Sequence, residues 1–328
     1  MAFKIISVYL LPFSLFYLAV IYLKRCLIRK KKLDIPVISV GNITAGGTGK
    51  TPLVMYIVSF YQRYGRHIIV SSSGAIKKSR GRYLKAAMED EAVMVKKNFP
   101  DITITGKSIE EITGKMTGNK KDIVVLDDGF HCHHLFKNMD VLVIDMANPF
   151  DNNMLLPSGL LREPKKELKR ADVFVLTHSY MVDKTKYQDL INYLGYFKKP
   201  IFIMDYEIKS LENNRGEISP VFIKNRVIVA FTGTGCPFNF FSLLSALSPS
   251  KIYGIIYPDH FLYQKQDIKE LESAFLEKDA EYLITTEKDY VKLNGYEWKV
   301  PLFYLKIKPV VKSINGEEFD ILLFNTVK

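Results

Sequence analysis

The chain has 328 residues, of which 48% are apolar and 25% charged, which excludes a disordered chain and leaves room for two folded domains. The formal net charge is +11, with basic residues crowded into positions 24–32, which favours an anionic surface and not nucleic acid as the partner. The three cysteines are odd in number and widely spaced, which argues against a disulfide framework and fits a reducing cytoplasm.

The first predicted element is a helix over residues 5–23, IISVYLLPFSLFYLAVIYL, which carries no charge. A helix needs about 20 apolar residues to cross a bilayer, so this one is at the boundary between spanning the membrane and lying in its surface. A signal peptide would have its basic end first, and a buried core helix is the remaining alternative. We expect an N-terminal membrane helix, with residues 1–32 membrane-associated and the basic cluster at the cytoplasmic headgroups.

Apolar, β-branched runs then alternate with segments of helix length. Runs of this kind are typical of strands covered on both faces, so we predict an α/β fold with a parallel sheet flanked by helices. The predicted strands of the first domain, residues 33–205, are 36–41, 67–72, 102–105, 122–127, 140–145, 172–177 and 201–205. Residues 206–225 are polar and irregular, which indicates a linker. A second, smaller domain, residues 226–328, has predicted strands at 226–233, 251–258, 281–286 and 301–307.

The phosphate loop, residues 41–51 with the sequence GNITAGGTGKT, follows the first strand and opens a helix with Pro52 in its first turn. Its glycines permit positive φ, so that backbone amides can point at phosphate oxygens. Lys50 would reach the β and γ phosphates, and Thr51 would bind Mg²⁺. The strict motif has glycine at the position of Thr44, and the alternative is an ordinary tight turn. The predicted nucleotide-binding residues are Gly46, Gly47, Thr48, Gly49, Lys50 and Thr51.

The strand DIVVLD ends in Asp127 and is followed by Asp128. Nucleotide-binding sheets place carboxylates that hold Mg²⁺ at this position, directly or through water. The alternative for such a strand end is a polar turn. Because it accompanies the phosphate loop, the pair supports a nucleotide site with ATP and Mg²⁺.

Five motifs in order resemble the tetraacyldisaccharide 4′-kinase family, the lipid A 4′-kinases of Gram-negative bacteria. They are VISVGNITAGGTGKTP, LDDGF, LLPSGLLREP (155–164), YPDH (257–260) and TTEKDYVKL (285–293), and the resemblance covers nearly the whole chain. It implies two α/β/α domains joined by a two-stranded linker. It also implies transfer of phosphate from ATP, with Mg²⁺, to the 4′-hydroxyl of an acylated disaccharide 1-phosphate at the cytoplasmic face of the inner membrane. We expect a monomer that binds anionic lipids and no nucleic acid.

The resemblance also implies roles for single residues. Asp90 would be the catalytic base, paired with His260, and Glu91 would join the metal site. Arg162 and Lys107 would contact the anionic substrate or the phosphates. The phosphate-loop and aspartate-pair residues keep the roles given above.

The chain departs from the family pattern at several positions. Ser73 stands where the family has arginine, and His131 and Cys132 follow Phe130 where the family has Gln-His. These changes bear on rate and geometry more than on reaction class. Two other functions stay open. One is a membrane-tethered switch ATPase, a class whose signature lysine would stand at Ala45, and the other is a nucleotide-binding regulator without kinase activity.

Overall fold

The structure is a computed structural model that describes residues 9–72, 94–119, 121–259, 261–293 and 295–328. The predicted residues Asp90, Glu91 and His260, and the departure at Ser73, lie outside the described residues. By its contacts the chain divides into two compact units. The first comprises Met1–Ile76, Phe99–Asp205 and Val310–Lys328, and the second comprises Lys77–Asn98 and Tyr206–Pro309.

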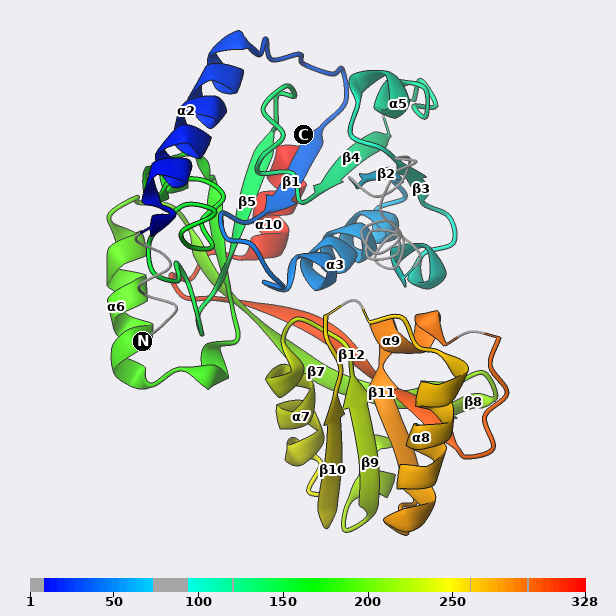
Figure 1. Cartoon of the computed structure of the whole chain (residues 1–328). Helices are drawn as coiled ribbons and strands as arrows, with labels where there is room; N and C mark the ends of the chain where they lie inside the picture. Colours follow the sequence, from blue (N-terminus) through cyan, green and yellow to red (C-terminus); the bar gives the residue numbers. More distant parts are fainter. Residues whose placement is uncertain (1–8, 73–93, 120, 260, 294) are drawn as a thin grey trace. The chain divides into compact units, whose positions relative to one another are not determined.

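The first unit is a parallel sheet with the strand order β7-β6-β5-β1-β4-β2-β3 (Figure 1). Its strands are β1 (Val37–Gly41), β2 (His67–Ser71), β3 (Thr103–Thr105), β4 (Asp122–Asp127), β5 (Met139–Asp145), β6 (Val173–Thr177) and β7 (Ile201–Asn213). Its helices are α2 (Leu11–Leu27), α3 (Lys50–Arg63), α5 (Ile109–Thr113), α6 (Lys184–Gly195) and α10 (Phe319–Thr326), with short 3₁₀ turns η1 (Lys165–Arg170) and η2 (Ser179–Met181). The prediction of a mostly parallel sheet flanked by helices is confirmed.

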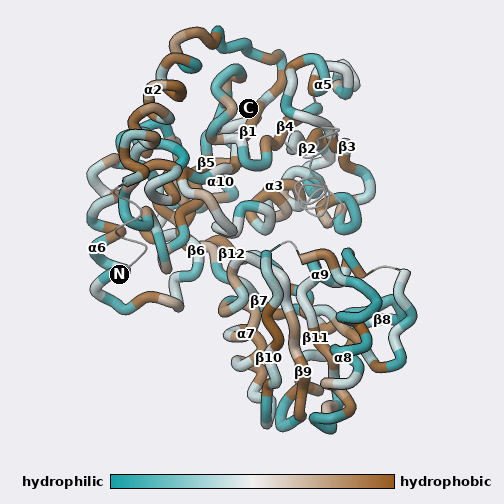
Figure 2. Tube along the Cα trace, in the orientation of Figure 1, coloured by the Kyte–Doolittle hydropathy of each residue, from teal (hydrophilic) through white to brown (hydrophobic). Residues whose placement is uncertain are grey.

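Burial on both faces explains why these strands were recognisable in the sequence. Every residue of β1, β4 and β6 is buried, and the strands are among the hydrophobic parts of the trace in Figure 2. The helix α3 packs on β1, β2 and β4. The last helix of the chain, α10, supports α3 in turn, because Tyr61 donates a hydrogen bond to the Leu323 carbonyl (2.7 Å) and Tyr56 to Asp320 (2.7 Å).

The second unit has its own parallel strands, in the order β10-β9-β11-β12. Its elements are β8 (Gly216–Ile218), η3 (Pro220–Ile223), β9 (Val227–Thr232), α7 (Pro237–Ala246), β10 (Lys251–Ile256), α8 (Lys265–Glu277), β11 (Tyr282–Thr286), α9 (Glu287–Lys292) and β12 (Leu302–Ser313). The segment predicted as a linker, residues 206–225, is largely extended, because β7 continues to Asn213 and pairs with β8 in an antiparallel hairpin. The domain boundaries set out above remain a prediction.

The motif at 285–293 serves the packing of the second unit. Asp289 is fully buried, and its carboxylate accepts hydrogen bonds from the Thr232 and Thr286 hydroxyls and the Gly233 amide, at 2.8–3.1 Å. Lys292 lies 3.1 Å from the same carboxylate. These contacts join the start of α9 to the end of β9.

The helix α2 lies in the segment where an N-terminal membrane helix was expected. It has 17 residues, with Lys24 and Arg25 in its last turn. Among the described residues, no helix is both long and apolar enough to cross a membrane. The predicted membrane helix is therefore not supported.

Candidate active site

Two neighbouring strands of the first unit bring the phosphate loop and the aspartate pair to one edge of the sheet. β1 and β4 are parallel neighbours, and Val40 pairs with Asp127 in their register. Their carboxyl ends therefore open at the same edge, which is where open α/β sheets bind ligands. The phosphate loop leaves β1 at this edge, and Asp128 leaves β4 beside it.

The glycines Gly46 and Gly49 determine the backbone path of the phosphate loop. Their φ values are 118° and 80°, in the region that residues with a side chain rarely adopt. Gly49 is the N-cap of α3, so the amides of the first helical turn have no acceptor within the helix. Together with the positive end of the helix dipole, these amides can bind a phosphate group.

Hydrogen bonds on two sides hold the phosphate loop at Thr48. Asn42, which follows β1, donates from its amide nitrogen to the Thr48 hydroxyl (3.0 Å). Thr177, at the end of β6, donates from its hydroxyl to the Thr48 carbonyl (3.1 Å). All three side chains are buried. Thr48 was predicted to bind nucleotide, and in the structure it is also the point at which the loop is anchored.

Thr44 occupies the position at which the strict motif has glycine, and its backbone pairing shows why glycine is not required. Thr44 forms an antiparallel bridge with Leu161. On either side of the bridge, the Ala45 amide donates to the Leu160 carbonyl, and the Arg162 amide donates to the loop, both at 2.7 Å. A β-branched residue suits such paired, extended backbone, whereas glycine there costs about 0.5–1 kcal/mol.

Asp128 lies among three positively charged side chains. Its two carboxylate oxygens are 3.0 and 3.1 Å from Arg162 Nη1, and Oδ1 is 4.0 Å from Lys50 Nζ. Lys107 Nζ donates to the Asp128 carbonyl (2.8 Å). Burial raises the pKa of Asp128, but the charges of Lys50, Arg162 and Lys107 outweigh it and leave that pKa below its ordinary value. Burial lowers the pKa of Lys107. Asp128 thus faces three basic side chains, an arrangement that favours a polyphosphate ligand.

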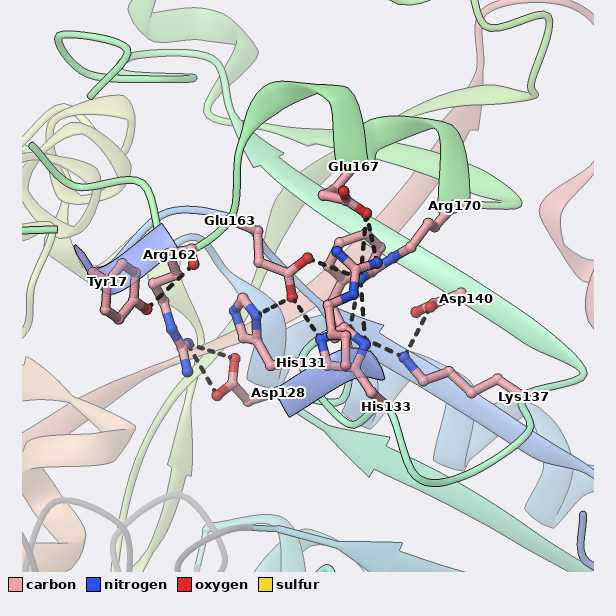
Figure 3. A network of polar contacts seen from close by, with 12 residues as sticks. Tyr17, Asp128, His131, His133, Lys137, Asp140, Arg162, Glu163, Glu167 and Arg170 are labelled. Carbon is pink, nitrogen blue, oxygen red and sulfur yellow. Dashed lines mark hydrogen bonds and ion pairs between the residues drawn. The ribbon is translucent and has the colours of Figure 1, made fainter. Parts of the chain in front are cut away.

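Glu163, next to Arg162, is a buried carboxylate that gathers two histidines and an arginine (Figure 3). Its Oε1 lies 2.6 Å from His131 Nδ1 and 3.2 Å from His133 Nε2, and its Oε2 lies 2.9 Å from Arg170 Nη1. Burial raises the pKa of Glu163, but hydrogen bonds from the two histidines and the charge of Arg170 bring it well below its ordinary value. Glu163 is therefore an anion at neutral pH, and it fixes the loop that follows Asp128.

The structure brings together Lys50, Thr51, Asp127, Asp128, Arg162 and Lys107, along with the glycines and Thr48 of the phosphate loop. It says nothing of Asp90, Glu91 and His260, which are not among the described residues. Sequence reasoning missed Asn42, Thr177, Glu163 and the contact of His131 with Glu163. The available signal for Glu163 was its place in the LREP motif, directly after Arg162.

The donor groups at this edge fit a magnesium ion that is bound mainly through nucleotide. Thr51 lies in the first turn of α3, and Asp127 is buried at the end of β4. Within the described ranges, no group of three or more His, Cys, Asp or Glu side chains could hold a metal by itself. Mg²⁺ usually binds one or two carboxylates and completes its shell with phosphate oxygens and water. A hydroxyl and two carboxylates match that requirement.

The fold and this site define the chain as a P-loop protein of the nucleotide-dependent phosphotransferase class. The family model described as Tetraacyldisaccharide-1-P 4'-kinase matches residues 6–325, and the chain belongs to that family. The Tetraacyldisaccharide 4'-kinase of Aquifex aeolicus is 33% identical over 96% of this chain and 97% of its own. That of Syntrophobacter fumaroxidans is 33% identical over 83% of this chain and 75% of its own.

A solved structure agrees with the family assignment. The crystal structure of LpxK from Aquifex aeolicus in complex with ATP superposes with a TM-score of 0.73 at 28% identity. The match covers 98% of this chain and 100% of the crystallised one. The fold of the relative therefore extends over both compact units.

The backbone pairing of Thr44 predicts that a glycine at this position, as in the strict motif, does not improve ATP binding. We expect Thr44→Gly to leave ATP affinity within about twofold of wild type and to lower stability by about 0.5–1 kcal/mol, because glycine loosens paired backbone. As the contrasting variant, Gly46→Ala strains a φ of 118° and should weaken ATP binding at least tenfold. Titration with a fluorescent ATP analogue and urea unfolding measure both. Tighter ATP binding by Thr44→Gly would contradict the account of the loop.

Proposed function

We propose that the chain transfers the γ-phosphate of ATP to the 4′-hydroxyl of a tetraacyldisaccharide 1-phosphate, a step of lipid A biosynthesis. The observation that carries this proposal is the position of Lys50 and Arg162 on either side of Asp128, beside the phosphate loop, in a chain that matches the kinase family over residues 6–325. The relatives named above carry this activity in their names, and one was crystallised with ATP.

The chain's own residues supply binding, orientation and charge neutralisation, which are the main requirements of phosphoryl transfer. The amides at the start of α3 hold the phosphate tail, and the Lys50 ammonium neutralises charge that develops on the transferred group. The Thr51 hydroxyl and the Asp127 and Asp128 carboxylates would hold Mg²⁺, which would supply further charge neutralisation for the phosphates. Asp128 also keeps the Lys50 and Arg162 side chains close to one another despite their like charge.

The acceptor side of the reaction rests on the family resemblance. Asp90 takes the proton of the sugar hydroxyl and His260 assists it, with Glu91 near the metal; all three lie outside the described residues. Arg162 and Lys107 are cations suited to the anionic groups of the substrate, and Arg162 can bind phosphate through two N–H groups at once.

The apolar face of α2 supports a further part of the proposal, attachment to a membrane surface. Phe13, Phe16, Leu23 and Leu27 recur on one side of the helix and are each more than half exposed. Much of α2 is hydrophobic in Figure 2, Lys24 and Arg25 lie in its last turn, and the basic residues at 29–32 follow the helix. An amphipathic helix with this pattern lies in the headgroup region of anionic lipid. Because its substrate is a lipid, the enzyme would act at the cytoplasmic face of the inner membrane. We propose that it does so as a monomer.

The two alternative functions have less support. A switch ATPase of the partitioning type would have its signature lysine at position 45, where this chain has Ala45. A regulator that binds nucleotide without transfer would not need Arg162 and Lys107 beside the phosphate loop. Neither alternative accounts for a family match over almost the whole chain.

The kinase proposal can be tested by a direct assay of phosphate transfer. Purified protein, γ-labelled ATP, Mg²⁺ and detergent-dispersed disaccharide lipid should give labelled lipid. Lys50→Ala should lower the rate at least 10³-fold, because the ammonium stabilises charge that develops in the transition state. The exposed Lys115→Ala serves as a matched control and should retain wild-type turnover. ATP-dependent dimerisation without labelled lipid would instead support the switch ATPase, and tight ATP binding with neither would support the regulator.

The assignment of the base predicts a different phenotype for Asp90→Ala. We expect turnover to fall at least 10²-fold while ATP affinity stays within about threefold, since a general base acts on the acceptor and contributes little to nucleotide binding. The neighbouring Glu89→Ala is the control for local charge. Turnover of Asp90→Ala at the wild-type rate would show that the base is another residue.

Membrane attachment predicts a loss of vesicle binding when the apolar face of α2 is made polar. Phe16→Ser combined with Leu23→Ser should weaken partition into phosphatidylglycerol-containing vesicles about tenfold or more, from the apolar area that no longer enters lipid. Tyr196→Ser, on an 83% exposed aromatic residue of the same unit, is the control and should bind as wild type does. Vesicle flotation at low and high salt provides the measurement. Unchanged flotation of the double variant would refute the proposed attachment.

A further inference from the structure

We propose that α2 has a second role beyond attachment: its polar face positions the segment that holds the phosphate loop and supplies Arg162. This inference rests on the kinase function proposed above. The segment concerned, residues 155–167, is called the clamp segment below. Ser14, Tyr17 and Arg25 make the contacts, and their spacing of three and eleven residues places them on one side of the helix.

Ser14 is the best-packed side chain of α2, although it is polar. It is 4% exposed, while apolar residues of the same helix lie in the open. Its hydroxyl donates to the Leu155 carbonyl (2.9 Å), and it is also paired with the hydroxyl (2.8 Å) and the amide (3.2 Å) of Ser158. A helix that served only to bind lipid would need no such set. Fully satisfied buried polar contacts define one arrangement of two elements, which is what positioning requires.

Tyr17 contacts Arg162, whose side chain pairs with Asp128 in the candidate site. Its hydroxyl donates to the carbonyl of Arg162 (3.2 Å), and Figure 3 shows the two residues together. The backbone amide of Arg162 donates to the Ile43 carbonyl in the phosphate loop (2.7 Å). The backbone of Arg162 is therefore held between α2 and the phosphate loop, while its side chain reaches Asp128.

Arg25 makes a second connection, through charge. Its guanidinium lies 2.7 Å from Glu167, whose carboxylate is also 3.6 Å from Arg170. Arg170 in turn pairs with Glu163, the carboxylate that holds His131. Ion pairs, and at the end the contact of Glu163 with His131, thus join the last turn of α2 to the loop after Asp128.

These contacts predict whether kcat or the KM for ATP changes when the contacts of α2 are removed. The glycine-rich turn has its own anchors at Thr48, from Asn42 and Thr177, so loss of the α2 contacts should leave ATP binding nearly intact. Arg162 has no other support for its carbonyl among the described hydrogen bonds, and small misplacements of a positioning group are costly for the chemical step. The effect should therefore appear in kcat more than in the KM for ATP.

The test compares two tyrosines of the same helix. Tyr17→Phe removes the hydroxyl that binds Arg162, whereas Tyr22→Phe removes a hydroxyl that has no hydrogen-bond partner among the described residues. In full-length protein with detergent-dispersed lipid, we expect kcat to fall about fivefold for Tyr17→Phe, the value of one neutral hydrogen bond. Tyr22→Phe should stay within about twofold. Both should keep wild-type vesicle binding and a KM for ATP within about twofold.

Variants of Arg25 provide a second test, in which one substitution removes the charge and another keeps it. Arg25→Met keeps length but removes charge and should lower kcat about threefold or more, while Arg25→Lys should restore at least half of the wild-type value. Thermal melts verify that each variant is folded at the assay temperature. Wild-type kcat in both Tyr17→Phe and Arg25→Met, or losses that track vesicle binding, would overturn the positioning role. Failure of the kinase proposal is distinguishable, because the wild-type protein would then label no lipid.

Discussion

The ion pair between Arg162 and Asp128 is the interaction on which the candidate site depends. Asp128 follows a central strand, whereas Arg162 comes from the clamp segment, and their pairing at 3.0 Å joins the two structures at the mouth of the sheet. Without the carboxylate, the guanidinium and the nearby Lys50 ammonium would repel each other in a partly desolvated place, where charges interact more strongly than in water. With it, both cations stay beside the phosphate loop. The single negative charge of Asp128 does not neutralise both Lys50 and Arg162. The site therefore keeps a net positive charge that suits a ligand with several negative charges.

The sequence predicted what depends on local pattern and missed what depends on contacts between distant parts of the chain. Strands such as β1 and β4 are buried on both faces, so their apolar runs were diagnostic, and the glycine turn was recognisable because positive φ demands glycine at 46 and 49. The contact of Ser14 with Leu155 spans 141 positions and that of Tyr61 with Leu323 spans 262, and no periodicity records such pairs. The same holds for the contacts by which Val310–Lys328 belong to the first compact unit, far along the chain from its other strands.

The departure from the family pattern at His131 and Cys132 has a physical explanation in the packing of that turn. Cys132 is buried in an apolar cluster with Leu126 and Leu135, and burial raises the pKa of its thiol, so it behaves as a small core residue. The polar groups of the same turn are its neighbours His131 and His133, and both contact Glu163. The turn therefore keeps polar side chains toward the clamp segment although its sequence differs. Thr44 follows the same logic, since a position that is paired and extended has no need of glycine.

The two faces of α2 follow from one constraint, that polar side chains need partners when they leave water. In a helix that crossed the bilayer, the hydroxyls of Ser14 and Tyr17 would face hydrocarbon, where an unsatisfied polar group is costly. In a helix that lies along the protein, those hydroxyls reach the backbone of the clamp segment, and the apolar side chains on the other face stay exposed. The polar contacts consequently set the rotation of α2 about its axis, and that rotation decides which residues can enter lipid. Attachment and alignment of the phosphate site are, on this argument, consequences of a single packing arrangement.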